Sequence, residues 1–104
     1  MAKVKAYVYK VPGLIDGYKV YPPVVILNKG DKFQLVNTVD DHDAELTVPA
    51  GVFENGAIDK EKINKRSGST EQTAKDTIIG VQYKVKVDGK DATGHSDPVI
   101  IIDP

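Results

Sequence analysis

The chain has 104 residues, of which 40% are hydrophobic and 28% are charged, and its formal net charge is −1. This is the length of one domain with its own core, and the near-zero charge excludes the strong basic field that attracts nucleic acid or an anionic lipid surface. Because there is no cysteine, disulfides, thiolate nucleophiles and sulfur-ligated metal centres are excluded as well.

The beginning of the chain predicts a strand at residues 3–11. Its residues alternate between an apolar face and a face that carries Lys5, Tyr7 and Tyr9. This period of two favours a half-buried strand, and the lysines favour a place near the edge of a sheet. The start of the chain lacks the apolar run of about 7–15 residues that a signal peptide needs, and no run approaches the roughly 20 residues of a membrane span. We therefore expect a cytoplasmic protein, or a mature or recombinant form of an exported one, without a membrane partner.

Residues 22–37, PPVVILNKGDKFQLVN, hold two apolar runs joined by a turn. The run at 24–27 is continuously aliphatic and predicts a buried strand. Gly30 in the turn tolerates a positive φ. Residues 33–37 predict the next strand, as expected for two neighbouring strands of a β-sandwich.

The middle of the chain is more polar. Residues 38–43, TVDDHD, predict an acidic loop that leads to a short strand at residues 44–48. The charged stretch 52–69 predicts mostly surface loop, with at most one short helical turn inside residues 52–66. Asp59 would be the N-cap of that turn.

The last third of the chain predicts further strands. Residues 69–79 predict an edge strand or an extended arm, and the clearest strand follows at residues 81–87, where three valines and Tyr83 share one face. An Asp-Gly pair at residues 88–89 predicts a hairpin turn. The final strand, at residues 98–102, is aliphatic without alternation, so we expect both of its faces to be covered.

These segments add up to six to eight short strands and no convincing long helix. There is no internal repeat and no interdomain linker. The sequence therefore predicts a single all-β domain over residues 1–104, a Greek-key β-sandwich of about seven strands.

Several motifs in this pattern are those of a known family. They are Pro23-Val24-Val25-Ile26 with Lys29-Gly30-Asp31, Phe33-Gln34-Leu35-Val36-Asn37, Asp41-His42 with Leu46-Thr47-Val48-Pro49, and Tyr83-Lys84-Val85-Lys86-Val87 followed by Pro98-Val99-Ile100-Ile101-Ile102. The sequence resembles the cupredoxin-like β-sandwiches, and the resemblance spans most of the chain. It implies a cupredoxin-like or immunoglobulin-like sandwich.

The same resemblance argues against the best-known function of that family. Cupredoxins that carry copper supply a histidine after the strand that ends in Asn, then Cys, His and usually Met around the last hairpin. His42 stands about where the first ligand would, and His95 lies in the last loop. Val87 or Asp88 stands in place of the cysteine, and Met1 is the only methionine. Without a thiolate, a blue-copper centre cannot form.

One loop concentrates ligand-type side chains, namely Asp40, Asp41, His42, Asp43 and Glu45. If the loops that carry His42 and His95 meet at one end of the sandwich, the two imidazoles with Asp41 and Asp43 would suit zinc, nickel or copper(II). The alternative is an acidic surface loop that contains a histidine. We predict no other cofactor.

No catalytic motif accompanies these residues. There is no G-x-S-x-G sequence, and Ser96 between His95 and Asp97 is no triad, because sequence neighbours point in different directions. We therefore expect a non-enzymatic interaction or assembly module whose partner is a protein or a second copy, and not nucleic acid. The clue to a binding role is the set Tyr7, Tyr9, Tyr18 and Tyr21. Tyr7 and Tyr9 share the outer face of the first strand and form the predicted interaction surface, with packing under a neighbouring loop as the alternative. The other functions left open are the metal-binding protein and an enzyme with a loop-borne site.

Overall fold

The computed structural model describes residues 2–13, 17–92 and 97–103, which form eleven strands and no helix. The strands are β1 (Lys3–Lys10), β2 (Tyr18–Tyr21), β3 (Val24–Leu27), β4 (Lys32–Asn37), β5 (Ala44–Val48), β6 (Ile58–Ile63), β7 (Gln72–Thr73), β8 (Ile79–Gln82), β9 (Lys84–Val87), β10 (Lys90–Asp91) and β11 (Val99–Ile102). In this part of the chain, no helix is long and apolar enough to cross a membrane.

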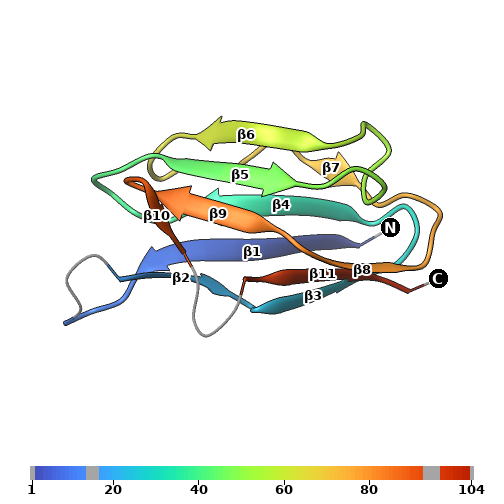
Figure 1. Ribbon diagram of the computed structural model, residues 1–104, viewed down its shortest axis with the longest axis horizontal. Coiled ribbons are helices and arrows are strands. Elements are labelled where there is room, and N and C mark those ends of the chain that lie inside the picture. The colour runs from blue at the N-terminus through green and yellow to red at the C-terminus, as the bar shows by residue number, and fades with distance from the viewer. Residues whose placement is uncertain (1, 14–16, 93–96, 104) are drawn as a thin grey trace.

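The strands form the two layers of a β-sandwich (Figure 1). One layer is the sheet β2-β1-β4-β7, and the other consists of the sheets β3-β11-β8 and β10-β9-β5-β6. These two sheets are joined because β8 runs into β9 with only Tyr83 between them. Two pairs, β1 with β4 and β3 with β11, are parallel, and the remaining pairs are antiparallel. The predicted all-β sandwich is confirmed.

The core between the layers follows from alternating residues of facing strands. An aromatic cluster lies within it, where Phe33 stacks on Phe53 with ring centroids 5.7 Å apart and meets the edge of Tyr83 at 6.0 Å. All three side chains are 1% exposed. Burying one such ring stabilises the fold by about 1.5–3 kcal/mol, so this cluster holds the two layers together.

The predicted edge position of the first strand is wrong. β1 lies between β2 and β4. Its Lys5 and Tyr7 are exposed because one face of this sheet meets solvent, and not because β1 has a free edge. Alternation indicates which face of a strand is buried, but it does not indicate the strand's place in the sheet.

Residues 58–63, expected to be surface loop or a helical turn with Asp59 as its N-cap, instead form β6, which pairs with β5, whereas the rest of residues 52–69 lies outside the named strands. Ile58 and Ile63 are five positions apart and would face opposite sides of a regular strand. The register between β5 and β6 shifts, and Lys60 takes a φ of 54°. This β-bulge adds one residue to β6 and turns both isoleucines toward the core, where they are 7% and 1% exposed.

Residues 81–87, expected as one strand, are divided between β8 and β9. β8 pairs with β11, whereas β9 pairs with β5, so the chain passes from one sheet to the next at Tyr83. The predicted shared face is confirmed for Tyr83, Val85 and Val87, which are all buried. This division and the two-residue strands β7 and β10 raise the number of strands above the expected seven.

Two strands expected to be buried are not fully covered on their outer face. β3 is an edge strand in which Val24 is 45% and Ile26 is 63% exposed, although Val25 and Leu27 are buried. β11 alternates between buried and half-buried residues, so the prediction that both its faces are covered is wrong. An aliphatic run without polar positions cannot by itself distinguish a strand covered on both sides from one with an apolar outer face.

Candidate functional site

The loop that carries His42 is anchored by a buried amide. Asn37 ends β4 and is completely buried. Its Nδ2 donates to the carbonyls of His42, at 3.1 Å, and Ile63, at 3.3 Å, while its Oδ1 accepts the N–H of Val39 at 3.0 Å. A buried amide with all these partners fixes the path of the loop. The backbone at His42 is therefore held in place.

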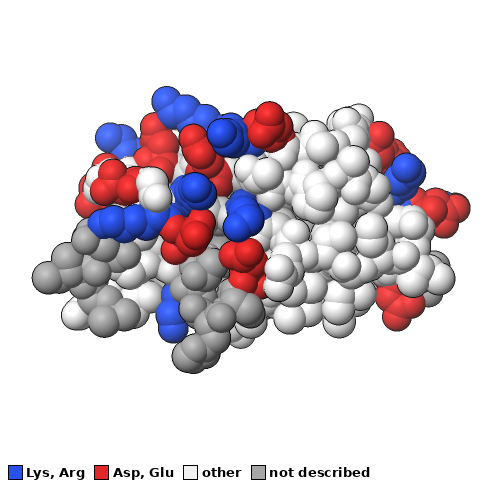
Figure 2. Space-filling model, in the orientation of Figure 1, with Lys and Arg blue, Asp and Glu red and all other residues white. Residues whose placement is uncertain are grey.

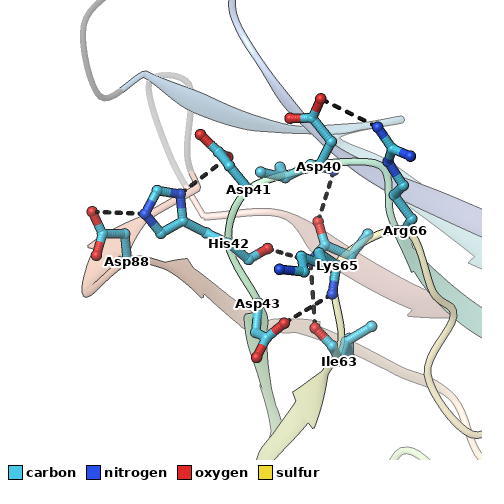
Figure 3. Close-up of polar contacts among 10 residues, drawn as sticks. Asp40, Asp41, His42, Asp43, Ile63, Lys65, Arg66 and Asp88 are labelled. Carbon is cyan, nitrogen blue, oxygen red and sulfur yellow. Dashed lines mark hydrogen bonds and ion pairs between the residues drawn. The ribbon is translucent and has the colours of Figure 1, made fainter.

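The imidazole of His42 lies between two carboxylates that come from different elements (Figure 3). Its Nδ1 is 3.0 Å from Asp41 Oδ1, and its Nε2 is 3.6 Å from Asp88 Oδ2. Asp88 and Gly89 have φ values of 53° and 74° and form the β9–β10 turn. These are the positive values that a two-residue type I′ hairpin needs. The end of β9, where the resemblance expects the copper ligand, therefore meets the His42 loop.

The other acidic residues of the loop are directed toward basic partners. Asp43 accepts the backbone N–H of Lys65 at 2.9 Å and pairs with Lys62 at 3.3 Å. The hydrogen bond from Lys65 holds the pKa of Asp43 below its usual value, as contact with His42 does for the pKa of Asp41. Asp43 therefore forms a separate set of contacts from the His42 ring.

This arrangement does not fit a blue-copper centre, because the strand end offers the buried aliphatic Val87 and the carboxylate of Asp88 in place of a thiolate. The two carboxylates lie at opposite nitrogens of the ring and do not converge. Within residues 2–13, 17–92 and 97–103, no group of three His, Cys, Asp or Glu side chains could hold a metal ion.

The proposed partner of His42 for metal, His95, lies outside the described residues, so the zinc or copper(II) site stays a prediction. Calorimetric titration of the wild type and a His42→Ala, His95→Ala double variant with zinc and copper(II) tests it. The prediction requires metal uptake that the double variant loses. Equal uptake by both proteins would remove the hypothesis.

Two shallow depressions lie near this end of the molecule. One, of about 200 Å³, is bordered by Asp43, Glu45 and Lys62 among others, and the second, of about 230 Å³, by Glu45, Thr47 and three lysines. Both are smaller than the 300–1,000 Å³ typical of small-molecule sites, and most of the residues around them are charged. They offer no enclosed place for a substrate.

The outer surfaces of the sandwich are more distinctive. We call the outward-facing positions of β3, β11 and β8 the apolar face; they are Val24, Ile26, Val99, Ile101, Gly80 and Gln82. Charged side chains gather over β5, β6, β9 and β10, and the surface around β8 and β11 is largely uncharged (Figure 2). The sequence prediction missed this face, although its residues were visible as aliphatic runs without lysine.

The second distinctive surface lies on the opposite layer. We call the outward-facing positions of β1, β2 and β4 the lysine–tyrosine face; they are Lys3, Lys5, Tyr7, Tyr9, Lys19, Tyr21, Lys32, Gln34 and Val36. Tyr7 is directly opposite Tyr21, and these side chains are 41% and 64% exposed, whereas Tyr9 is half-buried. The prediction that Tyr7 and Tyr9 share an outer face is confirmed, and their role in binding stays a prediction. That Tyr21 joins them on this face was missed.

Comparison with known proteins identifies the fold. No protein-family model matches the sequence, and no curated protein matches it either. Among solved structures, amicyanin from Paracoccus versutus aligns with a TM-score of 0.64 and 15% identity over 97% of this chain and 81% of its own. A reduced mutant of amicyanin aligns with a TM-score of 0.66 and 13% identity over 98% of this chain and 83% of its own. At these identities the likeness shows the fold alone, and that fold is the cupredoxin sandwich.

Proposed function

We propose that this cysteine-free protein with a cupredoxin fold is a non-enzymatic assembly module whose copies associate through the apolar face. One observation carries the proposal: large aliphatic side chains on this face are exposed, and none of the outward-facing residues beside them on the paired strands is charged. Ile26 is 63% and Val24 45% exposed. Contiguous exposed aliphatic side chains on one face make that face a candidate interaction site.

The register of the three strands makes the face continuous. Val24 lies beside Val99, which lies beside Gln82, and Ile26 lies beside Ile101, which lies beside Gly80. Gly80 leaves Ile101 uncovered on one side, because a Cβ at this glycine would lie 3.8 Å from Ile101 Cγ1 and shield it. The four aliphatic side chains therefore form one surface across β3 and β11, which Gly80 and Gln82 of β8 border.

Charge distribution favours a second copy as the occupant. In a twofold dimer the same patch meets itself, so a charged patch would meet its own charge. None of the six outward positions of the apolar face is charged. The lysine–tyrosine face, by contrast, carries four lysines, and two copies of it would repel one another. The apolar face is the self-complementary one.

The size of the face predicts weak association. Three strands about 4.8 Å apart, each of four residues rising about 3.3 Å, cover roughly 200 Å². A standard interface buries about 800 Å² from each partner. We therefore expect reversible association at about 0.1–1 mM chain, as suits a module that assembles at high local concentration.

Sedimentation equilibrium at increasing chain concentration tests the proposal. The wild type should become dimeric, and Ile26→Lys and Ile101→Lys should remain monomeric because a lysine at the twofold contact meets its copy. Thr70→Lys is the matched control, since Thr70 is exposed in the loop before β7 and should leave association unchanged. A monomeric wild type at the highest concentration would refute the proposal, as would equal association of all four proteins.

A further inference from the structure

We infer that the lysine–tyrosine face binds an acidic segment of a partner polypeptide. The surface is separate from the apolar face, which lies on the other layer of the sandwich, and the inference does not depend on self-association. It starts from a row of exposed aromatic rings. Tyr7 and Tyr21 are directly opposite one another on β1 and β2 and are among the most exposed large hydrophobic side chains described.

Lysines lie along the strands on both sides of this aromatic row. On β1, Lys5 precedes Tyr7 by two positions and so points to the same face. On β2, Lys19 precedes Tyr21 by two positions in the same way. Since β1 and β2 are antiparallel, the two lysines lie on opposite sides of the tyrosine pair. A partner that covers the rings therefore meets a positive charge at each end.

Further positive charge lies beyond Lys5 on the same face. Lys3 of β1 is directly opposite Lys32 of β4. Lys3 pairs with Glu71 at 3.5 Å, and Lys32 Nζ donates to the hydroxyl of Thr73 at 2.6 Å. Only the contact of Lys3 is to a carboxylate, and that carboxylate neutralises one positive charge. Most of the positive charge of the four lysines on this face therefore remains.

The strands of this sheet contain no compensating acidic residue. β1, β2 and β4 carry lysines, and none of the four strands β1, β2, β4 and β7 carries Asp or Glu. The carboxylate of Asp31, at the turn before β4, is directed to the backbone N–H groups of Ala2 and Asn28 at 3.1 and 2.9 Å. The face is therefore positive on a chain whose formal net charge is −1, and the complementary partner is negative.

The rest of the molecule favours a short polypeptide over a long polyanion. Beyond about 8–10 Å, charges are screened at physiological ionic strength. A short acidic segment would therefore be attracted mainly by the lysines directly under it. A long nucleic acid would also extend to surfaces that carry the carboxylates of Asp40, Asp41 and Asp88, which repel it. Tyrosine is, in addition, a favoured residue at protein interfaces, because its ring packs and its hydroxyl hydrogen-bonds.

Fluorescence anisotropy with a labelled peptide tests the inference. The probe alternates Glu and Leu over about ten residues, a length that spans β1, and a Lys-Leu peptide serves as its opposite. We expect the Glu-Leu peptide to bind at low salt and the Lys-Leu peptide not to bind. Tyr7→Ser with Tyr21→Ser, and separately Lys5→Glu with Lys19→Glu, should each weaken binding about tenfold or more.

The matched control is Lys60→Glu with Lys86→Glu, which makes the same change of charge on the other layer and should leave binding unchanged. Thermal unfolding of every variant confirms that the fold is retained. The inference is overturned if the Glu-Leu peptide does not bind, or if the control weakens it as much as Lys5→Glu with Lys19→Glu. Tighter binding of oligo-dT that depends on the same residues would assign the face to nucleic acid instead. Because all these measurements use dilute protein, their failure leaves self-association through the apolar face untouched.

Discussion

The two outer faces of the sandwich are built by the same rule and end with opposite properties. On both layers every second residue enters the core, so the outward positions are free to vary. On β3 and β11 these positions carry aliphatic side chains, on β8 they carry Gly80 and Gln82, and none of them is charged. On β1, β2 and β4 they carry tyrosines and four lysines. The comparison teaches that the inward-facing residues maintain the fold, whereas the outward-facing residues decide which partner each face binds.

The largest effect is expected from a residue beneath both faces. Phe33→Ala should lower the free energy of unfolding by about 3–5 kcal/mol, because Phe33 packs against both Phe53 and Tyr83. Ile26→Ser, on the apolar face, should change it by no more than about 0.5 kcal/mol while it abolishes self-association. Urea denaturation measures both variants. A large loss of stability in Ile26→Ser would mean that the apolar face belongs to the core.

Salt should affect the two faces in opposite directions. Raising sodium chloride from about 0.05 to 0.5 M screens exposed charges, so binding of the Glu-Leu peptide to the lysine–tyrosine face should weaken several-fold. Self-association through the apolar face involves no charge and should not weaken; sodium sulfate should strengthen it. Anisotropy and sedimentation titrations at matched salt measure the two responses. The same direction of change in both would break the distinction between the faces.

A smaller effect is expected at Tyr83, which lies between the two layers. Its hydroxyl is buried and has no hydrogen-bond partner among the described residues. Tyr83→Phe should therefore be neutral or raise the free energy of unfolding by about 1 kcal/mol, with both surface activities unchanged. Denaturation at neutral pH measures the change. A loss of more than about 1 kcal/mol would show that the hydroxyl is satisfied in solution.

The same residue predicts a dependence on alkaline pH. Burial raises the pKa of Tyr83 above its usual value of 10, so the unfolded chain releases this proton at a lower pH than the folded chain. The stability contributed by Tyr83 is therefore present below pH 10 and is lost as the pH rises above it, by about 1.4 kcal/mol per pH unit until the folded pKa is reached. Tyr83→Phe should lack this part of the decline between pH 10 and 12. Parallel declines in both proteins would contradict the assignment.

Much of the fold, but little of the surface, could be predicted from sequence. Alternation at Ala6 and Val8, the turn at Gly30 and the hairpin at Asp88 each depend on a few neighbouring residues, and all agree with the structure. The order of strands in a sheet depends on distant pairings, so the central position of β1 was not predicted. The bulge at Lys60 obscured the period of β6, which is why this strand was expected to be a loop.

The candidate surfaces could be predicted only in part, because they too depend on how distant parts of the chain pack together. Tyr7 and Tyr9 share a face because they are two positions apart on one strand, and this much follows from sequence. That Tyr21 completes the aromatic row depends on the pairing of β1 with β2. The exposure of Ile26 depends on the absence of any element over β3 among the described residues, and an aliphatic run cannot indicate this.

Amide chemical shifts recorded at increasing chain concentration test self-association through the apolar face most directly. In ¹H–¹⁵N spectra between about 0.05 and 1 mM chain, we expect concentration-dependent shifts at Val24, Ile26, Gly80 and Ile101, with Lys5 and Tyr7 unchanged. Ile101→Lys should abolish these shifts. Spectra that do not change with concentration, or shifts confined to the lysine–tyrosine face, would contradict the account.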